Sequence, residues 1–452
     1  MGLGVAVSHE PSLVSQTPAM TPSIQASDPC VHCGFCLPTC ASYRALGTEM
    51  DSPRGRIHTL KAIEAGELQF DAAVASHFDS CLGCYACVSA CPAGVRYDQL
   101  IEAVRPQLNT LQLRTPWQRQ LRQLLLKLLP YPRRLRALLQ PLRAYAGGPL
   151  QRLARSSGLS RLAGPELAAM EQLLPALPAA AFGPDPAGVL PAEGSRRARV
   201  GLVLGCVQRV FDAEVNQATL AVLRANGVEV VLPAEQGCCG AVSHHQGELE
   251  QTRQLATDLV QRFEQAAGSE PLDAVLVAAS GCGHTLKHYP ELLEGAQGFS
   301  APVKDVHEFL IALGLSDSFR ARLQPLPLKV AYHDACHMIH GQGIQAQPRD
   351  LLRAIPGLSL KEATEAGVCC GSAGIYNILQ PEEAATLGAL KANDLAATGA
   401  ELVASANIGC TLQIRHHLGA LGHPQAVLHP MQLLARSAGL SPAGAPTAAS
   451  TT

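Results

Sequence analysis

Two stretches of the sequence share one cysteine spacing and decide the N-terminal fold. Residues 30–40 read CVHCGFCLPTC, and residues 81–92 read CLGCYACVSACP. Each stretch contains C-x2-C-x2-C-x3-C, the run that binds [4Fe–4S] clusters in two-cluster ferredoxins. Three closely spaced thiolates hold three irons of one cube, and the fourth thiolate ligates the neighbouring cluster. The sequence therefore predicts two [4Fe–4S] clusters whose ligands interleave.

The expected ligand sets are read directly from this spacing. One cluster takes Cys30, Cys33, Cys36 and Cys91, and the other takes Cys81, Cys84, Cys87 and Cys40. The first run departs from the usual pattern only at Ala41, where proline is common. Two zinc sites are the alternative, but zinc favours C-x2-C pairs about 15–20 residues apart.

The 40 residues between the two runs favour helices. Ser52 is expected to cap a helix that has Pro53 in its first turn and Gly66 as its stop. A second short helix is expected to begin at Asp71. This pattern resembles the all-helical ferredoxin domain of succinate dehydrogenase iron–sulfur subunits more than the compact βαββαβ ferredoxin.

Composition and charge narrow the class of protein. The 452 residues have a formal net charge of −2, which gives no overall reason to expect nucleic acid as a partner. No basic signal-peptide region and no apolar run of about 18 residues is present, so we expect a cytoplasmic protein without a transmembrane helix. Residues 1–24 and 437–452 are small and polar and are expected to be disordered. In a reducing compartment, clustered cysteines indicate metal rather than disulfides.

The other eight cysteines belong to an internal repeat. In each copy a buried strand leads to one cysteine, a Cys-Cys-Gly loop follows, and a later strand leads to the last. The first copy has Cys206, Cys238, Cys239 and Cys282, and the second has Cys336, Cys369, Cys370 and Cys410. The offsets between copies are 130 (206 to 336), 131 (239 to 370) and 128 (282 to 410). Such constant offsets, with strands alternating with helices, predict two copies of one parallel α/β unit.

Each copy should bring its four thiols to the carboxyl-terminal edge of its sheet. Four converging thiolates favour a further iron–sulfur site, whereas buried structural thiols are the simpler alternative. A Cys-Cys-Gly loop at matched places in both copies favours the cluster. Gly240 and Gly371 would let the backbone turn tightly beside it.

Several longer motifs resemble one known family. They are GCCGAVSHHQG, YHDACHMIHGQGI, QPRDLL, CCGSAGIYNILQPE and NIGCTLQIRHH. They are similar to motifs of the glycolate oxidase (glycolate dehydrogenase) iron–sulfur subunit. The wider group includes the CCG-containing subunit of heterodisulfide reductase and lactate-utilisation proteins, which share this cysteine-rich "CCG" domain. The resemblance covers essentially residues 25–435.

The resemblance implies a multi-domain architecture. A helical two-[4Fe–4S] ferredoxin domain would occupy 25–102 and a basic helical linker 103–197, followed by tandem α/β CCG domains at 198–315 and 326–436. It also implies an electron-transfer role beside flavoprotein subunits that hold the glycolate site, with a quinone-type acceptor.

One departure from the wider CCG pattern limits the number of clusters. That pattern ends in C-x-x-C, but Ala279 and Asn407 stand at the first of those positions. Four thiols per domain favour one cluster per domain rather than the pair of noncubane clusters that five thiols would share.

Histidines near these loops offer extra ligands or quinone-site donors, although each is individually more typical of packing or hydrogen bonding. They are His244, His245, His333, His337 and His340. His333 and His337, beside Cys336, are the strongest candidates.

Residues 103–165 contain twelve Arg or Lys residues and no Asp or Glu. Leucines recur there at helical spacing, and prolines 130, 132 and 141 divide the stretch into short helices. Three interpretations stay open: a packed linker with a solvated basic face, a docking surface for acidic partner subunits, and a peripheral contact with the inner face of a membrane, helped by Trp117 and Tyr131. Nucleic acid is disfavoured, because no aromatic stacking platform accompanies the charge.

The chain has no G-x-G-x-x-G dinucleotide loop, so no flavin or nicotinamide of its own is expected. Oxidation of glycolate to glyoxylate would then belong to the complex and not to this isolated chain. The same architecture could serve lactate or glycerol-3-phosphate oxidation, because the hydroxyacid pocket would lie on another subunit. A CCG-type disulfide reductase is the other alternative, and the two missing cysteines weigh against it.

Overall fold

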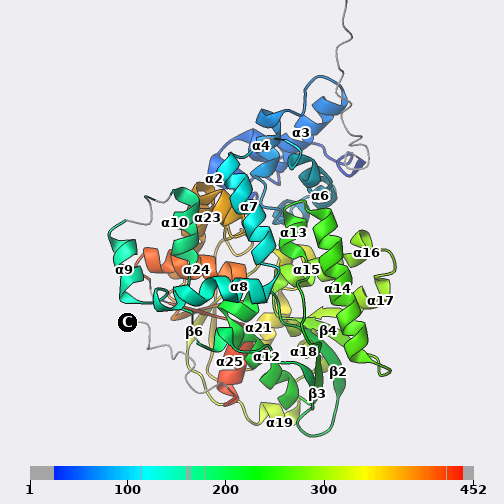
Figure 1. Ribbon diagram of the computed structural model, residues 1–452, viewed down its shortest axis with the longest axis vertical. Helices are drawn as coiled ribbons and strands as arrows, with labels where there is room; N and C mark the ends of the chain where they lie inside the picture. The colour runs from blue at the N-terminus through cyan, green and yellow to red at the C-terminus, as the bar shows by residue number, and fades with distance from the viewer. Residues whose placement is uncertain are drawn as a thin grey trace, which may run out of the picture.

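The computed structural model describes residues 25–440, apart from 112, 159–161, 163, 178 and 424. The predicted disorder of residues 1–24 and 441–452 lies outside the described residues. The helices around the ferredoxin cysteine runs form one end of the molecule, and the two sheets lie toward the other (Figure 1). In the described part no helix is long and apolar enough to cross a membrane.

The ferredoxin portion is built from short helices around the cysteine runs. They are α2 (Ala41–Leu46), α3 (Pro53–Glu64), α4 (Ala72–Asp79), α5 (Ala86–Ser89) and α6 (Tyr97–Leu108), with the 3-10 turn η1 (Glu49–Asp51) before α3. Ser52 Oγ accepts from Gly55 N at 3.0 Å, and Asp71 Oδ1 accepts from Val74 N at 2.9 Å. Both helix starts are therefore where the capping residues predict them.

The linker is a series of helices that each begin at a proline. They are α7 (Pro116–Leu128), α8 (Pro132–Leu139), α9 (Pro149–Ser156) and α10 (Pro165–Leu173), with 3-10 turns η2 (Gln140–Ala144) and η4 (Ala179–Phe182). The linker then ends in a strand, β1 (Gly188–Leu190), that pairs antiparallel with β3 of the first sheet. The first sheet thus begins ten residues before 198, the expected domain boundary. The sequence did not indicate this strand, because its edge pairing depends on a distant partner.

The two sheets share one topology. The first has the order β1-β3-β2-β4-β5 and the second the order β7-β6-β8-β9, and all pairs except β1 with β3 are parallel. The strands of the first are β2 (Ala198–Val203), β3 (Val228–Leu232), β4 (Ala274–Val277) and β5 (Val303–Asp305). Those of the second are β6 (Lys329–His333), β7 (Ser359–Glu362), β8 (Leu402–Ser405) and β9 (Ala426–Leu428). The prediction of two tandem copies of a parallel α/β unit is confirmed.

Helices flank both sheets. Those of the first domain are α11 (Gln208–Phe211), α12 (Ala213–Ala225), α13 (Ala241–His245), α14 (Leu249–Ala267), α15 (Ser280–Lys287), α16 (Tyr289–Leu292), α17 (Gln297–Ser300) and α18 (Val306–Leu313), and α19 (Asp317–Arg320) leads into the second. The second domain has α20 (Cys336–Gln342), α21 (Ala346–Arg353), α22 (Tyr376–Leu379), α23 (Pro381–Ala397), α24 (Ile408–Ala420) and α25 (Pro430–Ser437).

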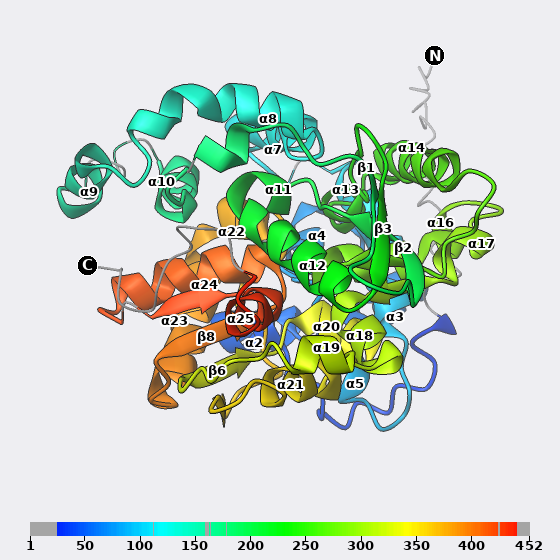
Figure 2. The same cartoon turned by 90° about the horizontal axis from the view of Figure 1, so that it is seen from below.

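The two domains pack together through equivalent helices. α12 of the first domain packs against α25 of the second, and α18 of the first packs against α21 of the second (Figure 2). Because α12 corresponds to α21 and α18 to α25 in the repeat, the two contacts are equivalent. One hydrophobic cluster runs through both, with Leu223 and Leu310 from the first domain and Leu352 and Met431 from the second fully buried. This shared core fixes the relative position of the two Cys-Cys-Gly loops.

The C-terminal boundary of the second domain lies beyond residue 436. Ser437 is buried, and its Oγ donates to Gln324 O at 2.7 Å. Leu440 N donates to Ala435 O at 2.8 Å. Residues 437–440 therefore complete the last helix and its cap, and the prediction that they are disordered is wrong.

Candidate iron–sulfur centres and the cavity between them

The two ferredoxin runs exchange one cysteine each. One small pocket is lined by Cys30, Cys33, Cys36 and Cys91, and a second by Cys40, Cys81 and Cys84; Cys87 lines both. The chain makes this exchange because helices α3 and α4 bring the second run back beside the first. These thiol groupings match the interleaved arrangement that the spacing predicts.

A buried cation lies beside the second of these pockets. Arg56 is fully buried, and its guanidinium donates to His77 O at 2.6 Å and to the hydroxyls of Ser42 and Ser80 at 3.0 and 2.9 Å. The same residue lines the pocket of Cys40 and Cys81. A fixed positive charge here would offset the negative charge of thiolate ligands in a poorly solvated site.

Each CCG domain gathers its own four thiols. In the first, Cys238 Sγ lies 3.1 Å from Cys206 Sγ, and thiol contacts continue through Cys239 to Cys282. The hydrogen bond from Cys238 and burial together raise the pKa of the Cys206 thiol well above its usual value. Such buried thiols would stay protonated on their own, so binding a metal centre would have to offset the cost of ionising them.

The second domain repeats this series of thiol contacts. It runs from Cys336 through Cys369 and Cys370 to Cys410. Cys410 lies in the first turn of α24 rather than at the end of β8, which stops at Ser405. The last cysteine of each copy therefore sits on the helix that follows the strand, one turn further than the sequence suggested.

The two tight turns after the paired cysteines need glycine. Gly240 and Gly371 have φ angles of +78° and +86°, the left-handed region that other residues rarely adopt. A Cβ on Gly371 would lie 2.8 Å from Ala384 O, so a side chain there would have to displace the backbone of α23. The loop thus holds both thiols against the end of the sheet, and the residues present fit an iron–sulfur centre.

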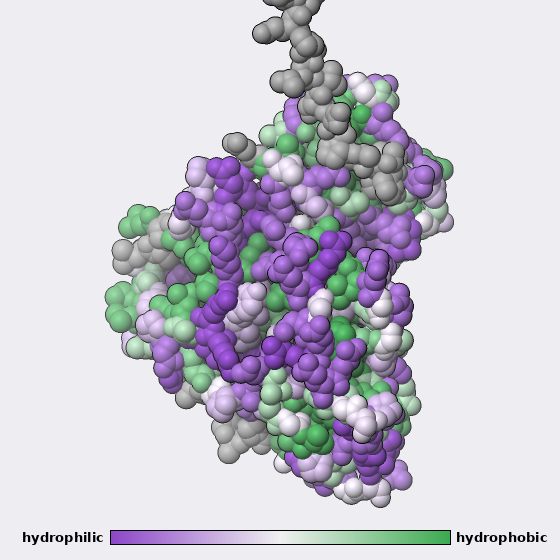
Figure 3. All heavy atoms as spheres, turned by 45° about the vertical axis from the view of Figure 1, so that its right-hand side comes forward, coloured by the Kyte–Doolittle hydropathy of each residue, from purple (hydrophilic) through white to green (hydrophobic). Residues whose placement is uncertain are grey.

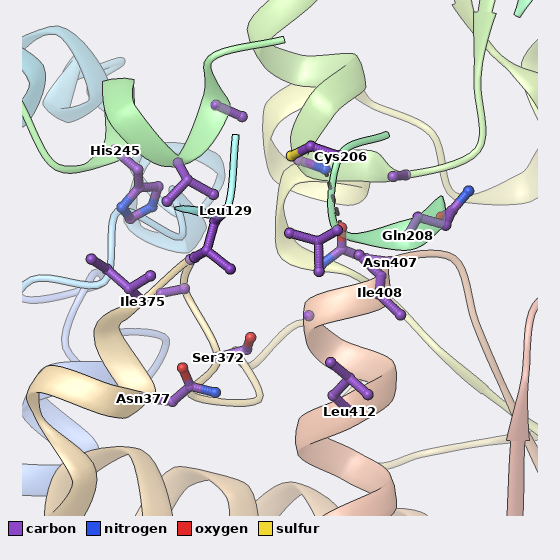
Figure 4. Close-up of a pocket in the computed structure, with 18 of the residues that line it drawn as sticks. Leu129, Cys206, Gln208, His245, Ser372, Ile375, Asn377, Asn407, Ile408 and Leu412 are labelled. Atoms are coloured by element: carbon purple, nitrogen blue, oxygen red, sulfur yellow. Dashed lines mark hydrogen bonds between the residues drawn. The ribbon is translucent and has the colours of Figure 1, made fainter. Parts of the chain in front are cut away.

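Asn407 occupies the place of the missing fifth cysteine in the second copy. Its Nδ2 lies 3.3 Å from Cys410 Sγ, and its Oδ1 accepts from Gly281 N of the first domain at 3.4 Å. Figure 4 shows this amide at the start of α24, on the side that faces the first domain, where Gly281 lies in the first turn of α15. Across the same junction Ser280 N donates to Ala406 O at 3.2 Å. Asn407 therefore ties the two cysteine sites together.

Both CCG thiol sets open onto one cavity of about 500 Å³. Its lining includes the eight CCG cysteines and leucines from α7, α8 and α10 of the linker. Figure 4 shows linker Leu129 opposite Asn407 and Leu412 of the second domain. Polar side chains line it too, namely Tyr85, Glu102, Arg105, His244, His245, His284 and His337. The sequence did not single out Tyr85, Glu102, Arg105 or His284, because each comes to the cavity from a distant segment.

The five candidate histidines divide into two groups. His333 lies with Cys370 and Cys410, and the ligand atoms of the three lie within 4.8 Å of one another. Its Nδ1 is 3.2 Å from Ser405 Oγ, and its Nε2 is buried without a partner in the described structure. Burial lowers the pKa of His333 to about 3, so the ring is neutral and able to coordinate.

The other four histidines face the ferredoxin portion. His337 Nε2 lies 2.8 Å from Gly83 O, and His340 Nδ1 lies 2.9 Å from Ser89 Oγ. His245 Nδ1 is 2.5 Å from Arg105 Nη1, and His244 Nε2 is 3.6 Å from Glu102 Oε1. These side chains hold the ferredoxin portion on the two CCG domains.

This contact brings ferredoxin cysteines close to the second CCG site. Leu82 packs in one buried cluster with Cys369 and Tyr376, and Cys84 and Cys336 lie against it. Burial raises the pKa of the Cys84 thiol, and the neighbouring Cys336 contributes. The two thiol sets are therefore neighbours in space although 252 residues separate Cys84 from Cys336 (336 − 84).

Part of the basic linker serves packing. Arg136 Nη2 lies 2.5 Å from Asp185 Oδ1, and Arg122 Nη1 lies 2.7 Å from Glu248 Oε1. Both arginine side chains are largely buried, with exposed fractions of 14% and 9%. Arg133 in contrast keeps 81% of its side chain exposed. The solvated basic face is thus smaller than the charge count suggests.

Comparison with protein-family models divides the chain in the same way. Residues 26–95 match a 4Fe-4S dicluster domain, and residues 200–287 and 330–415 each match the "Cysteine-rich domain" CCG. Residues 117–174 match the model described as "Glycolate oxidase iron-sulfur subunit, linker region".

Curated relatives match nearly the whole chain. A protein of Bacillus subtilis named "Probable glycolate oxidase iron-sulfur subunit" is 36% identical over 422 residues, covering 91% of this chain and 94% of that protein. The "Glycolate oxidase iron-sulfur subunit" of Escherichia coli is 32% identical over 400 residues, covering 87% and 90%. "Lactate utilization protein A" of Exiguobacterium sp. is 29% identical over 243 residues, covering 52% of this chain. With a dicluster domain, the linker and two CCG domains in this order, the chain belongs to the family of glycolate oxidase iron–sulfur subunits.

Proposed function

We propose that this chain is the electron-transfer subunit of a complex that oxidises glycolate to glyoxylate. It would accept electrons from flavin on partner subunits and deliver them to a quinone-type acceptor. The support comes from relatives that carry the name glycolate oxidase subunit over about nine-tenths of the chain. Lactate utilization protein A matches only 52% of it, which favours glycolate over lactate.

One contact carries this proposal. The ferredoxin portion is held on the CCG domains by His337 and His340, with Cys84 beside Cys336. Iron–sulfur clusters supply one-electron transfer when bound. Neighbouring thiol sets in a buried, rigid contact suit a relay, whereas a disulfide reductase would need only the CCG domains.

We assign all sixteen cysteines as ligands. The interleaved ferredoxin sets hold two [4Fe–4S] clusters. The first CCG domain uses Cys206, Cys238, Cys239 and Cys282 for one cluster, and the second uses Cys336, Cys369, Cys370 and Cys410 for another. Four clusters correspond to about sixteen irons per chain.

His333 is the further donor that we assign to the second CCG site. A ring nitrogen of His333 lies within 4.8 Å of the thiols of Cys370 and Cys410, and its Nε2 is buried without a hydrogen-bond partner in the described residues. The position 130 residues earlier in the first copy is Val203, which has no donor atom. The two CCG centres should therefore differ in their ligands and in their reduction potentials, because imidazole ligation raises the potential of an iron–sulfur centre.

The ligand assignment is tested by iron and acid-labile sulfide analysis of anaerobically reconstituted protein. Cys238→Ser and Cys369→Ser should each lose about one cluster's worth of iron, roughly four atoms, while ferredoxin signals persist. His333→Leu should remove nitrogen hyperfine coupling from the electron paramagnetic resonance signal of one centre, and Val203→Leu is the matched control. About eight irons in the unmodified chain would mean that the CCG cysteines are structural.

The function itself is tested on the complex. Affinity-tagged chain should co-purify with a flavoprotein whose flavin is bleached by glycolate. Bleaching by lactate or glycerol-3-phosphate instead would move the proposal to the alternative substrate. A chain that cleaves a disulfide without any flavoprotein would support the reductase alternative and overturn the proposal.

A further inference from the structure

The cavity between the CCG domains has two chemically different sides. Its inner side carries the CCG thiols, and its outer side is closed by leucines of the linker. The leucines are Leu124, Leu125, Leu128, Leu129, Leu135, Leu138, Leu139 and Leu142, joined by Ile375 and Met170. The proposed iron–sulfur centres would occupy the inner side, so the leucine-lined part is the space left for another occupant.

The mouth of the cavity lies in the linker. Leu124 and Leu138 line the cavity and are still 50% and 51% exposed, and Leu142 is 39% exposed. Leucine side chains at a cavity mouth are unfavourable in water, so their exposure points to an apolar surrounding.

The linker surface next to the mouth combines apolar and basic side chains. On α9, Leu150 and Leu153 are 65% and 60% exposed, and Trp117 at the start of α7 is 47% exposed. Exposed basic residues accompany them on α7, α8 and α9, namely Arg119, Lys127, Arg133, Arg134 and Arg152. Figure 3 shows hydrophobic side chains gathered at the left edge of the view, where α9 and α10 lie in Figure 1. This combination is typical of helices that lie on an anionic lipid surface.

Polar groups lie at the ferredoxin side of the same cavity. Tyr85 OH donates to Glu102 Oε1 at 2.5 Å, and the ring of Tyr85 stacks on His337 at 5.1 Å with an 8° tilt. Nδ1 of His244 is buried without a hydrogen-bond partner in the described residues. A ligand with carbonyl or hydroxyl oxygens on a flat ring would find donors and aromatic faces here.

We propose that this cavity binds a membrane quinone, with its ring near His244 and its isoprenoid tail between the leucines of α7 and α8. The inference rests on the proposed function, which requires a quinone-type acceptor. The part of the cavity that is lined by linker leucines and by the polar side chains of the ferredoxin side is the space left for the ring and the first units of its tail. The exposed leucines give the tail a continuous apolar path to the bilayer.

The chemistry balances with the activity proposed for the complex. Oxidation of one hydroxyacid to its oxoacid releases two electrons and two protons. Reduction of one quinone to the quinol takes up two electrons and two protons. The thiol-lined side of the cavity would hold the electron source beside the ring, and the two protons would come from solvent. Glu102 and His244, whose Oε1 and Nε2 atoms lie 3.6 Å apart, line the same cavity.

The test uses the reconstituted full chain without flavoprotein or hydroxyacid. A decylquinone that carries its photoreactive azide on the decyl tail should label α7 or α8, located by peptide mass spectrometry. Excess unlabelled decylquinone should prevent that labelling, whereas decanol should not. Binding can also be followed by quenching of Trp117, the only tryptophan in the sequence.

The variant pair Leu124→Gln with Leu138→Gln should weaken decylquinone binding about tenfold or more, because both side chains line the mouth. Leu390→Gln, at a similarly exposed leucine of α23 outside the cavity, should bind as the unmodified chain does. His244→Gln should weaken binding of the quinone while leaving the membrane affinity of the chain unchanged.

Three results would overturn the inference. They are labelling elsewhere on the chain, no decylquinone binding, and equal binding by the Leu124/Leu138 and Leu390 variants. None of them changes the assignment of glycolate oxidation to the complex, which is read from flavin bleaching; they would remove only this cavity as the acceptor site. Conversely, a complex that oxidises another hydroxyacid leaves quinone binding by this chain intact.

Discussion

The glycines of the Cys-Cys-Gly loops allow a graded test of the CCG sites. Gly371, Gly240 and Gly374 all have positive φ angles, of +86°, +78° and +70°. Replacing glycine by alanine in this backbone conformation lowers the free energy of unfolding by about 1–2 kcal/mol at each position. The three differ in what a Cβ would meet. At Gly374 the nearest atom is 3.9 Å away, at Gly240 it is 3.2 Å away, and at Gly371 it is 2.8 Å away.

The contact at Gly371 cannot relax easily. The nearest atom is the backbone oxygen of Ala384 in α23, and Leu387 Cβ follows at 3.0 Å. Overpacking a buried site costs about 1–3 kcal/mol more. Gly371→Ala should therefore lower the free energy of unfolding by about 2–5 kcal/mol and Gly374→Ala by about 1–2 kcal/mol. The effect of Gly240→Ala should lie between these two.

The assay is urea unfolding under anaerobic conditions combined with iron analysis. Gly371→Ala should also lose iron from the second CCG site, because it displaces the loop of Cys369 and Cys370, while the ferredoxin signals remain. If Gly371→Ala unfolds at the same urea concentration as Gly374→Ala and keeps its full iron content, the close packing of this turn does not hold the site and the reasoning is refuted.

Three further outcomes are expected. Cys91→Ser should perturb the same ferredoxin signal as Cys30→Ser and not that of Cys81→Ser; a match with Cys81→Ser would reverse the ligand sets. The purified, reconstituted chain should not reduce an artificial dye with glycolate, and turnover without a flavoprotein would contradict the subunit role. Burial raises the pKa of Asp212 to about 6 although Arg415 lies 3.7 Å away, so the stability that its protonated form contributes below pH 4 is lost as the pH rises through 6. Between pH 5 and pH 8 this should lower the free energy of unfolding of the unmodified chain by about 1 kcal/mol. In Asp212→Asn that decrease should be absent, which is checked by comparing the urea midpoints at the two pH values.

The features that the sequence predicted correctly are encoded locally or repeated. Ser52 and Asp71 cap helices through contacts three residues away. The copies of the α/β unit are visible because their cysteines recur at nearly constant offsets. Neither inference required knowledge of contacts between residues that are far apart in the sequence.

The features that were missed depend on long-range partners. Arg136 reads as part of a basic face, but Asp185, 49 residues later, buries and neutralises it. His337 and His340 read as ligand candidates because they neighbour Cys336, whereas their rings turn to Gly83 and Ser89. The cavity combines the linker, the ferredoxin portion and both CCG domains, so no single stretch of sequence indicates it.

The histidines also show that the two copies of the repeat make different contacts although they share one topology. The positions 130 residues before His333, His337 and His340 are Val203, Val207 and Val210. The first copy therefore lacks the side chains with which the second contacts Gly83 and Ser89 and approaches Cys370 and Cys410. Valines in those places could neither hold the ferredoxin portion nor donate to a metal. The shared topology supplies two equivalent thiol sites, and these three differences give only the second copy a histidine beside its thiols and the contacts to Gly83 and Ser89.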